Sequence, residues 1–290
     1  MLHKVPAHEI KKHTRSISDT KQKQVANLQN HIQDIFGSEH HTFLQGSYAN
    51  DTAISDINDV DIVVIRKKTH SGEHSPHKFP QSIPWGQIFS EIEQKLRNQT
   101  KYDWEVSRAD KCIEVTTSTF KADVVPAVLV NDDHLTDPIA IYSFEEQREK
   151  VNSPRTHQLK STTKHQLTGE NFKPMVRLFK KWLDCTFGED KPISSYEIES
   201  LVHSAPHDCF SNDHVASFIL IANHICELLN KSSFSILSVC GTEDVAQKSH
   251  PNDWKRLGMK LQESLGCATA AYKADSIAQA TLFWDKAFNS

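Results

Sequence analysis

The chain has 290 residues, of which 38% are hydrophobic and 24% are charged, and its formal net charge is −4. This is the composition of an ordinary globular protein, long enough for one large domain or two packed lobes. It excludes a dedicated, broadly basic nucleic-acid binder, so we expect no stable binding of nucleic acid.

The cysteines and the apolar segments predict a cytoplasmic protein that does not enter the membrane. The six cysteines form no CxxC pair and are expected to be reduced thiols. The first 14 residues lack the apolar core of a secretory signal. The most apolar late stretch, residues 217–229, contains Asn223, His224 and Glu227, so it is too short and too polar to cross a bilayer.

The first half of the chain mixes helical and strand-like patterns. Apolar residues at helical spacing predict a long amphipathic helix over residues 18–36 and a second helix over residues 85–98. Between them, a β-branched run predicts a strand over residues 60–65, followed by a polar loop over residues 67–84. Three strand-like runs with turn signals between them then favour antiparallel neighbours, at residues 102–107, 111–116 and 118–130.

The second half predicts a helical lobe. Residues 131–168 are mostly polar, contain Pro138 and Pro154, and are typical of a transition between lobes. We therefore expect an α+β fold in which residues 1–160, with the N-terminal helix, form a mixed-sheet core that packs on a C-terminal helical lobe of residues 161–290. The helices expected there cover residues 172–186, 195–204, 214–230, 252–266 and 268–288.

Asp59 and Asp61 are the strongest candidates for chemistry. Side chains at positions i and i+2 of a strand point to the same face, so both carboxylates should project together from the start of the strand over residues 60–65. Two carboxylates so close repel each other unless a cation lies between them. Oxygen ligands suit Mg²⁺ or Mn²⁺, and two such ions are what phosphoryl transfer onto a hydroxyl requires.

A third carboxylate and a glycine-serine turn complete the pattern. Asp123 is a lone acid on a mostly apolar strand, near Pro126, which suggests a strand edge or end. On a neighbouring strand, Asp123 could share a metal ion and help to deprotonate an attacking hydroxyl. Gly46 and Ser47 could hold a triphosphate, because glycine admits a close approach and the serine hydroxyl and backbone N–H groups bind phosphate oxygens.

Each piece alone has an ordinary explanation. A glycine-serine turn is common, an Asp-x-Asp pair also occurs in calcium loops and at solvated strand edges, and a single strand acid is usually a surface residue. The three pieces in this order reinforce one another and favour a metal-dependent nucleotidyltransferase.

The same residues carry a family resemblance. Gly46-Ser47, Asp59-Val-Asp61 and Asp123-Val-Val-Pro-Ala resemble the DNA polymerase β-type nucleotidyltransferase superfamily. The block GSYANDTAISDINDVDIVVI is similar to the bacterial cGAS/DncV-like nucleotidyltransferases, and weaker similarity extends through most of the chain. The resemblance implies a polymerase β-like core closed by a helical lobe, with nucleotides in the cleft between them.

The resemblance also implies roles for three residues of the helical lobe. Lys180 and Ser195 stand where relatives contact the donor phosphates, and Tyr196 stands where they stack an aromatic ring on the base. From the residues alone, Lys180 could lie on a solvated helix face, Ser194 and Ser195 could simply start a helix, and Tyr196 could be core.

The resemblance implies that the product is a cyclic di- or trinucleotide second messenger, made from ATP, GTP or other nucleoside triphosphates with release of pyrophosphate. Such a messenger would activate a separately encoded effector in bacterial anti-phage (CBASS) defence, and a regulatory protein is a possible further partner. Three alternatives stay open: an enzyme that extends an RNA end or makes linear oligonucleotides, a nucleotidylating toxin that modifies a protein or tRNA, and a non-catalytic nucleotide-binding module.

Overall fold

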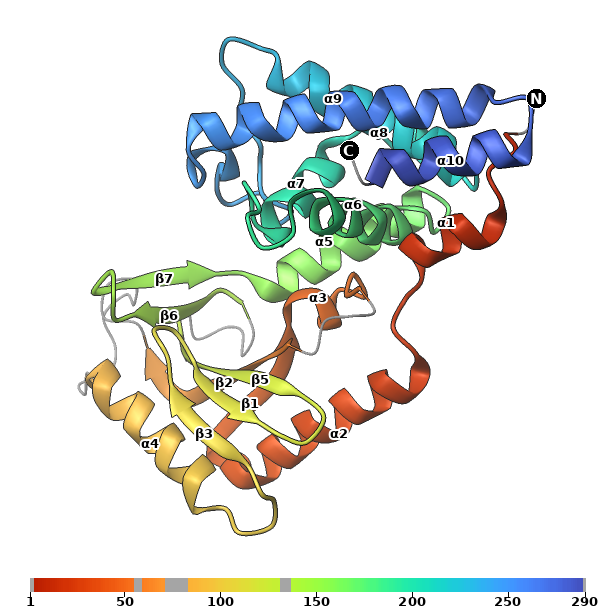
Figure 1. The fold of residues 1–290 in the computed structure, drawn as a ribbon. Helices are drawn as coiled ribbons and strands as arrows, with labels where there is room; N and C mark the ends of the chain where they lie inside the picture. Colours follow the sequence, from red (N-terminus) through yellow and green to blue (C-terminus); the bar gives the residue numbers. More distant parts are fainter. Residues whose placement is uncertain (1–2, 55–58, 71–82, 131–136, 289–290) are drawn as a thin grey trace. The chain divides into compact units, whose positions relative to one another are not determined.

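The computed structural model describes residues 3–54, 59–70, 83–130 and 137–288 (Figure 1). The chain divides into a sheet unit, Ile17–Gln158, and a helical unit that joins Met1–Ser16 to Leu159–Ser290. Helix α5 (Pro154–Leu167) begins in the first unit and ends in the second. None of the described helices has both the length and the apolar character needed to cross a membrane.

The sheet unit contains a mixed sheet of seven described strands. The main path runs β1-β2-β5-β4-β3, and β6 and β7 continue from β5. Only β2 and β5 are paired in parallel; the other described pairs are antiparallel. The elements are α2 (Asp19–Phe36), η1 (Gly37–Glu39), β1 (His40–Gln45), α3 (Gly46–Ala49), β2 (Asp59–His70), α4 (Trp85–Asn98), β3 (Glu105–Arg108), β4 (Ile113–Thr116), β5 (Lys121–Leu129), β6 (Ile139–Ser143) and β7 (Arg148–Asn152).

Strand β2 is buried on both faces, which explains its unbroken apolar run. Val60, Ile62 and Val64 pack into a core cluster that also contains the apolar faces of α2 and α4. Val63 and Ile65 belong to a second cluster on the opposite face. The alternation follows from the two-residue period of a strand, and full burial is the usual condition of a strand in parallel pairing.

The helical unit is built around one large apolar cluster. Helices α6 to α10 contribute most of it, and Val5, just before α1, joins the same cluster. The Nε atom of Arg177 also donates a hydrogen bond to the carbonyl oxygen of Thr14, 2.8 Å away, so the N-terminal segment belongs with these helices. The elements are α1 (Ala7–Thr14), α6 (Phe172–Phe187), α7 (Ser195–Ser204), η2 (His207–Cys209), α8 (His214–Leu229), η3 (Val245–Gln247), α9 (Pro251–Lys273) and α10 (Ile277–Phe288).

The expected elements mostly form, with three corrections. The segment expected to be a transition, residues 131–168, contains β6, β7 and α5 in its described part. The helix expected to stop at residue 266 continues through Gly266 to Lys273, because one glycine lowers helix propensity by only about 1 kcal/mol. Strand β2 extends to His70, into the expected loop; residues 71–82 of that loop lie outside the described residues.

Pro126 lies inside β5, not at its end. On one side, β5 pairs with β2 throughout, and Pro126 stands opposite Val64. On the other side, the described pairing with β4 stops at Val124 and pairing with β6 starts at Val128. Pro126 falls in this interruption, where its missing N–H removes no ladder hydrogen bond.

Candidate active site

The parallel pairing of β2 and β5 brings the three predicted carboxylates to one place. Asp59 and Asp61 open β2, and the register sets Asp61 directly opposite Asp123 of β5. Residues opposite each other in a parallel pair present their side chains on the same face of the sheet, and Asp59 shares that face two positions earlier. The strand order therefore assembles an acidic group from two distant segments of the chain.

The surroundings of Asp61 and Asp123 make ionisation of their carboxyl groups less favourable. Burial, and then the negative charges of Asp123 and Asp59, raise the pKa of Asp61 to about 7. Burial also raises the pKa of Asp123, although a hydrogen bond from Cys112 and the charge of Lys121 oppose the shift. Perturbed carboxyl groups of this kind cluster at functional sites.

Cys112 is a member of the site that the sequence did not single out. It precedes β4, and its thiol is hydrogen-bonded to Asp123. Burial and the nearby negative charge of Asp123 raise the pKa of Cys112 to about 12, so the thiol stays protonated and acts as a donor. A single cysteine beside a turn carries no pattern that marks this contact, which depends on the pairing of β4 with β5.

Gly46 allows the turn before α3 to pass close to Asp61. Its φ angle is +68°, and a Cβ atom at this position would lie 2.4 Å from the Oδ2 atom of Asp61. Ser47 follows in α3, where its carbonyl oxygen accepts a hydrogen bond from the N–H of Thr52. The structure thus places Gly46 directly beside Asp61, and Ser47 is the next residue along the chain.

We expect Gly46→Ala to damage both the fold and the activity. The left-handed backbone alone costs about 1 kcal/mol for a residue with a Cβ, and the clash with Asp61 should displace that carboxylate. A displacement of about 1 Å can lower a rate on the order of 100-fold. Gly37→Ala is the matched control, because Gly37 has φ +60° and nothing within 4 Å of the added Cβ. The activity and the denaturant unfolding curve of each variant are measured. Equal losses of activity in Gly46→Ala and Gly37→Ala would contradict a special role for the close approach of Gly46 to Asp61.

The carboxylates fit a hard divalent cation by chemistry, although they do not enclose one as they stand. Among the described residues, no three acidic, histidine or cysteine side chains are close enough to surround a metal ion. Asp59 is exposed, whereas Asp61 is partly buried. A cation would therefore have to draw the Asp59 side chain toward the other two carboxylates, which would relieve the repulsion that raises the pKa of Asp61.

In the helical unit, Lys180 is buried in an ion pair. Its Nζ atom lies 2.8 Å from the Oε2 atom of Glu199 on α7, and each side chain is only 4% exposed. Arg177, one turn earlier on α6, is also buried. The alternative of a solvated face at these two positions is therefore wrong, because other elements of the unit cover them. The contact of Lys180 with phosphates stays a prediction.

Ser194 and Ser195 occupy different positions at the start of α7. Ser194 caps α7: its Oγ accepts a hydrogen bond from the N–H of Glu197, and the Glu197 carboxylate accepts one from the N–H of Ser194. Ser195 is the exposed first residue of α7. Tyr196, next along, is half-buried, and its hydroxyl donates to Glu243 over 2.9 Å.

These two serines give a matched pair of variants. Ser194→Ala should lower the free energy of unfolding by about 1 kcal/mol, because it removes the Oγ atom that accepts a hydrogen bond from the N–H of Glu197, and should leave the KM for nucleotide nearly unchanged. Ser195→Ala should change stability by less than about 0.5 kcal/mol and should raise KM if Ser195 binds phosphate. Denaturant unfolding and steady-state kinetics measure the two effects, and the reverse pattern would exchange the assignments.

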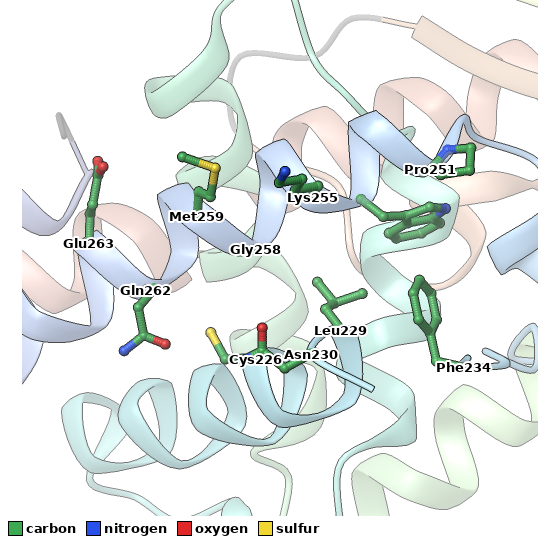
Figure 2. Close-up of a pocket in the computed structure, with 11 residues that line it drawn as sticks. Cys226, Leu229, Asn230, Phe234, Pro251, Lys255, Gly258, Met259, Gln262 and Glu263 are labelled. Carbon is green, nitrogen blue, oxygen red and sulfur yellow. The ribbon is translucent and has the colours of Figure 1, made fainter. Parts of the chain in front are cut away.

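A separate hollow of about 590 Å³ lies between α8 and α9 (Figure 2). Leu229 and Phe234 stand on one side of it, and Gly258 and Met259 of α9 on the other. None of the predicted site residues lines it. The candidate active site therefore rests on the geometry of β2, β5 and α3, not on this hollow.

Comparisons with known proteins agree with the geometry. Residues 160–261 match the family model described as the cGAS/DncV-like nucleotidyltransferase C-terminal helical domain. A cyclic UMP-AMP synthase of Rhodothermus marinus is 28% identical over 198 residues, which cover 62% of this chain and 68% of the relative. The cyclic GMP-AMP synthase CdnE03 of Staphylococcus schleiferi is 29% identical over 231 residues, 70% of this chain and 71% of the relative. The chain is thus similar to cGAS/DncV-like nucleotidyltransferases in its helical part and to cyclic nucleotide synthases over most of its length.

Solved structures of this family confirm the expected fold. The CdnE cyclic dinucleotide synthase of Elizabethkingia meningoseptica, solved with GTP and Apcpp, aligns with a TM-score of 0.71 and 25% identity over 90% of this chain and 99% of that one. CdnC of Escherichia coli MS115-1, solved with ATP, aligns with a TM-score of 0.74 over 99% of this chain and 98% of that one. CdnC is only 16% identical, so it supports the fold alone. The α+β prediction, a polymerase β-like core with a C-terminal helical lobe, is confirmed.

Proposed function

We propose that this cGAS/DncV-like nucleotidyltransferase joins nucleoside triphosphates into a cyclic di- or trinucleotide and releases pyrophosphate. The observation that carries the proposal is the placement of Asp61 opposite Asp123 on parallel strands, with Gly46 packed against Asp61. The names of the relatives, which are cyclic nucleotide synthases from several bacteria, support the product class.

Asp59, Asp61 and Asp123 would hold two divalent cations, Mg²⁺ or Mn²⁺. When bound, such cations stabilise the attacking oxygen and the leaving pyrophosphate. A ribose hydroxyl oxygen attacks the α-phosphorus, the bond from that phosphorus to the pyrophosphate oxygen breaks, and the hydroxyl proton passes to the Asp123 carboxylate.

The remaining predicted residues would bind the donor nucleotide. Gly46 and Ser47 would hold its triphosphate at the end of β1, because the glycine turn admits a phosphate close to the backbone. Lys180 and Ser195 would contact the phosphates, and Tyr196 would stack on the base, as the family resemblance implies. Lys180 can do so only if its pairing with Glu199 is shared with, or exchanged for, a phosphate oxygen.

The test is incubation of the purified protein with all four ribonucleoside triphosphates and Mg²⁺ or Mn²⁺, followed by phosphatase treatment and mass spectrometry. A phosphatase-resistant cyclic species, absent with Asp59→Ala/Asp61→Ala, is the expected result. Linear products would support the RNA-type alternative, and radiolabel transferred to a macromolecule would support the toxin. Absence of pyrophosphate release in every condition, including with added cell extract, would leave a nucleotide-binding module.

The wider setting follows from the family resemblance. The product would activate a separately encoded effector in anti-phage (CBASS) defence, and the protein would act in the cytoplasm. A regulatory protein is a further possible partner; a related CdnC from Escherichia coli MS115-1 has been solved in complex with a HORMA protein.

A further inference from the structure

Tyr196 is connected to the segment between α8 and α9 through its hydroxyl group. The hydroxyl donates to the Oε1 atom of Glu243 over 2.9 Å. Burial raises the pKa of Tyr196, so the hydroxyl keeps its proton and remains a donor. The ring that the proposed function places against a base is therefore held at its outer end by a residue 47 positions later in the chain.

Lys248 covers one face of the same ring. Its Nζ atom lies 5.0 Å from the centroid of the Tyr196 ring and 2.9 Å from the Oε2 atom of Glu243. Glu243 thus uses one carboxylate oxygen for the tyrosine hydroxyl and the other for the lysine. The three side chains form a closed arrangement in which the ammonium group is positioned over the aromatic face.

The backbone around Glu243 is itself well fixed. The N–H of Ser238 donates to the carbonyl oxygen of Glu243 over 2.9 Å. Asp244 accepts hydrogen bonds from the N–H groups of Ile236 and Ala246. The Nζ atom of Lys160 donates to the carbonyl oxygen of Cys240 over 2.6 Å. A carboxylate on such a loop can hold a ring in one orientation, because it does not move freely itself.

The exposure of the charged pair argues that its role is not stability. The Lys248 and Glu243 side chains are 45% and 40% exposed, and ion pairs this exposed contribute about 0–1 kcal/mol to folding. A cation held over an aromatic ring has instead a directional effect, because it fixes the ring and occupies one of its two faces.

We propose that Glu243 and Lys248 are positioning residues for Tyr196: Glu243 anchors the ring through its hydroxyl, and Lys248 occupies one ring face and directs a stacking nucleobase to the opposite face. This inference rests on the proposed function, since it concerns how the donor base is received. It adds two residues, on a segment outside the recognised motifs, to those that set the affinity for the nucleotide.

The test compares Lys248→Met, Glu243→Gln and the double variant. Glutamine keeps an acceptor for the tyrosine hydroxyl but loses the charge that holds Lys248. Each single variant should therefore raise the KM for nucleotide about 3- to 10-fold, in line with the strength of a cation–π contact, with kcat changed less than about 2-fold. The double variant should be no worse than either single one, and Lys248→Arg should restore the wild-type KM.

Lys260→Met is the matched control. Lys260 also forms an ion pair with a glutamate of the helical unit, Glu263, at 2.8 Å, and its side chain is 38% exposed. Equilibrium binding of a non-hydrolysable nucleoside triphosphate should weaken in Lys248→Met and not in Lys260→Met. Additive effects in the double variant, or equal nucleotide binding by Lys248→Met and Lys260→Met, would overturn the inference about Glu243 and Lys248. The proposed function would still stand if the wild type converted nucleotides. Failure of the wild type to bind or convert any nucleotide would overturn both.

Discussion

Replacement of Asp61 by asparagine is expected to abolish product formation and, at the same time, to stabilise the metal-free protein. Under the proposed function the carboxylate helps to hold the cations, so activity should fall on the order of 1,000-fold or more. Without cations the same carboxylate is buried beside Asp123 and Asp59, which raises its pKa to about 7. An isosteric neutral side chain removes that repulsion and should add roughly 2–4 kcal/mol to the free energy of unfolding at pH 8.

The pH dependence follows from the direction of the shift. The raised pKa keeps folded Asp61 protonated up to about pH 7, whereas unfolded Asp61 loses its proton near the ordinary aspartate pKa of 3.8. The folded state binds more protons between these values, so the stability of the metal-free wild type should fall as pH rises from about 4 to 7 and level off above. The difference between Asp61→Asn and wild type should grow over the same interval.

The measurements are denaturant unfolding in the presence of a chelator across this pH range, and product formation with Mg²⁺. Asp34→Asn is the control, because Asp34 is an exposed residue of α2. It should change neither property. Loss of stability in Asp61→Asn at pH 8 would show that favourable contacts hold the ionised carboxylate. That result would contradict the inference that Asp61 is destabilised by its neighbouring carboxylates when no cation is bound.

The second large effect concerns the buried pair of Lys180 and Glu199. Lys180→Met is expected to lower the free energy of unfolding by about 3–5 kcal/mol, because it removes the ammonium group that lies 2.8 Å from the buried Glu199 carboxylate. Lys180→Met/Glu199→Leu should recover most of this loss, since two apolar side chains of similar size often replace a buried ion pair without net cost. Denaturant unfolding of the single and double variants measures the coupling.

The double variant also separates structure from function. If Lys180 contacts the donor phosphates, the double variant should fold normally and still have a raised KM for nucleotide. Recovery of both stability and KM would mean that Lys180 serves the fold only. Lys260→Met, in a pair whose side chains are 38% and 53% exposed, should cost no more than about 1 kcal/mol and serves as the exposed control.

The central strands and the acidic group could be predicted from the sequence because their signals are local. The run from Val60 to Ile65 indicates a buried strand, and two aspartates at i and i+2 share a face in any strand. To predict that Asp123 lies beside them, one has to assume only that its strand is a neighbour of theirs. Their parallel pairing and register, with Asp61 opposite Asp123, came from the structure.

The contacts made by distant side chains could not be predicted in this way. Cys112 reaches Asp123 only because β4 pairs with β5, and Glu199 and Glu243 reach Lys180 and Tyr196 through tertiary packing. The polar, half-exposed residues of β7 resemble a linker. Strand β6 is apolar and largely buried but only five residues long, and it lies in a mostly polar stretch. The side-chain contacts join residues of different elements, and the periodicity within one element carries no information about them.

The parallel pair of β2 and β5 has a consequence for folding. Parallel neighbours cannot be joined by a tight turn, so the pairing of Asp61 with Asp123 spans roughly sixty positions of sequence, including α4, β3 and β4. The chain loses conformational entropy in closing so long a loop before the contacts between the two strands can compensate for it. Folding is therefore slowed. During refolding the carboxylates of Asp61 and Asp123 should therefore come together only as the centre of the sheet forms, after the local helices, and helical signal should return before activity.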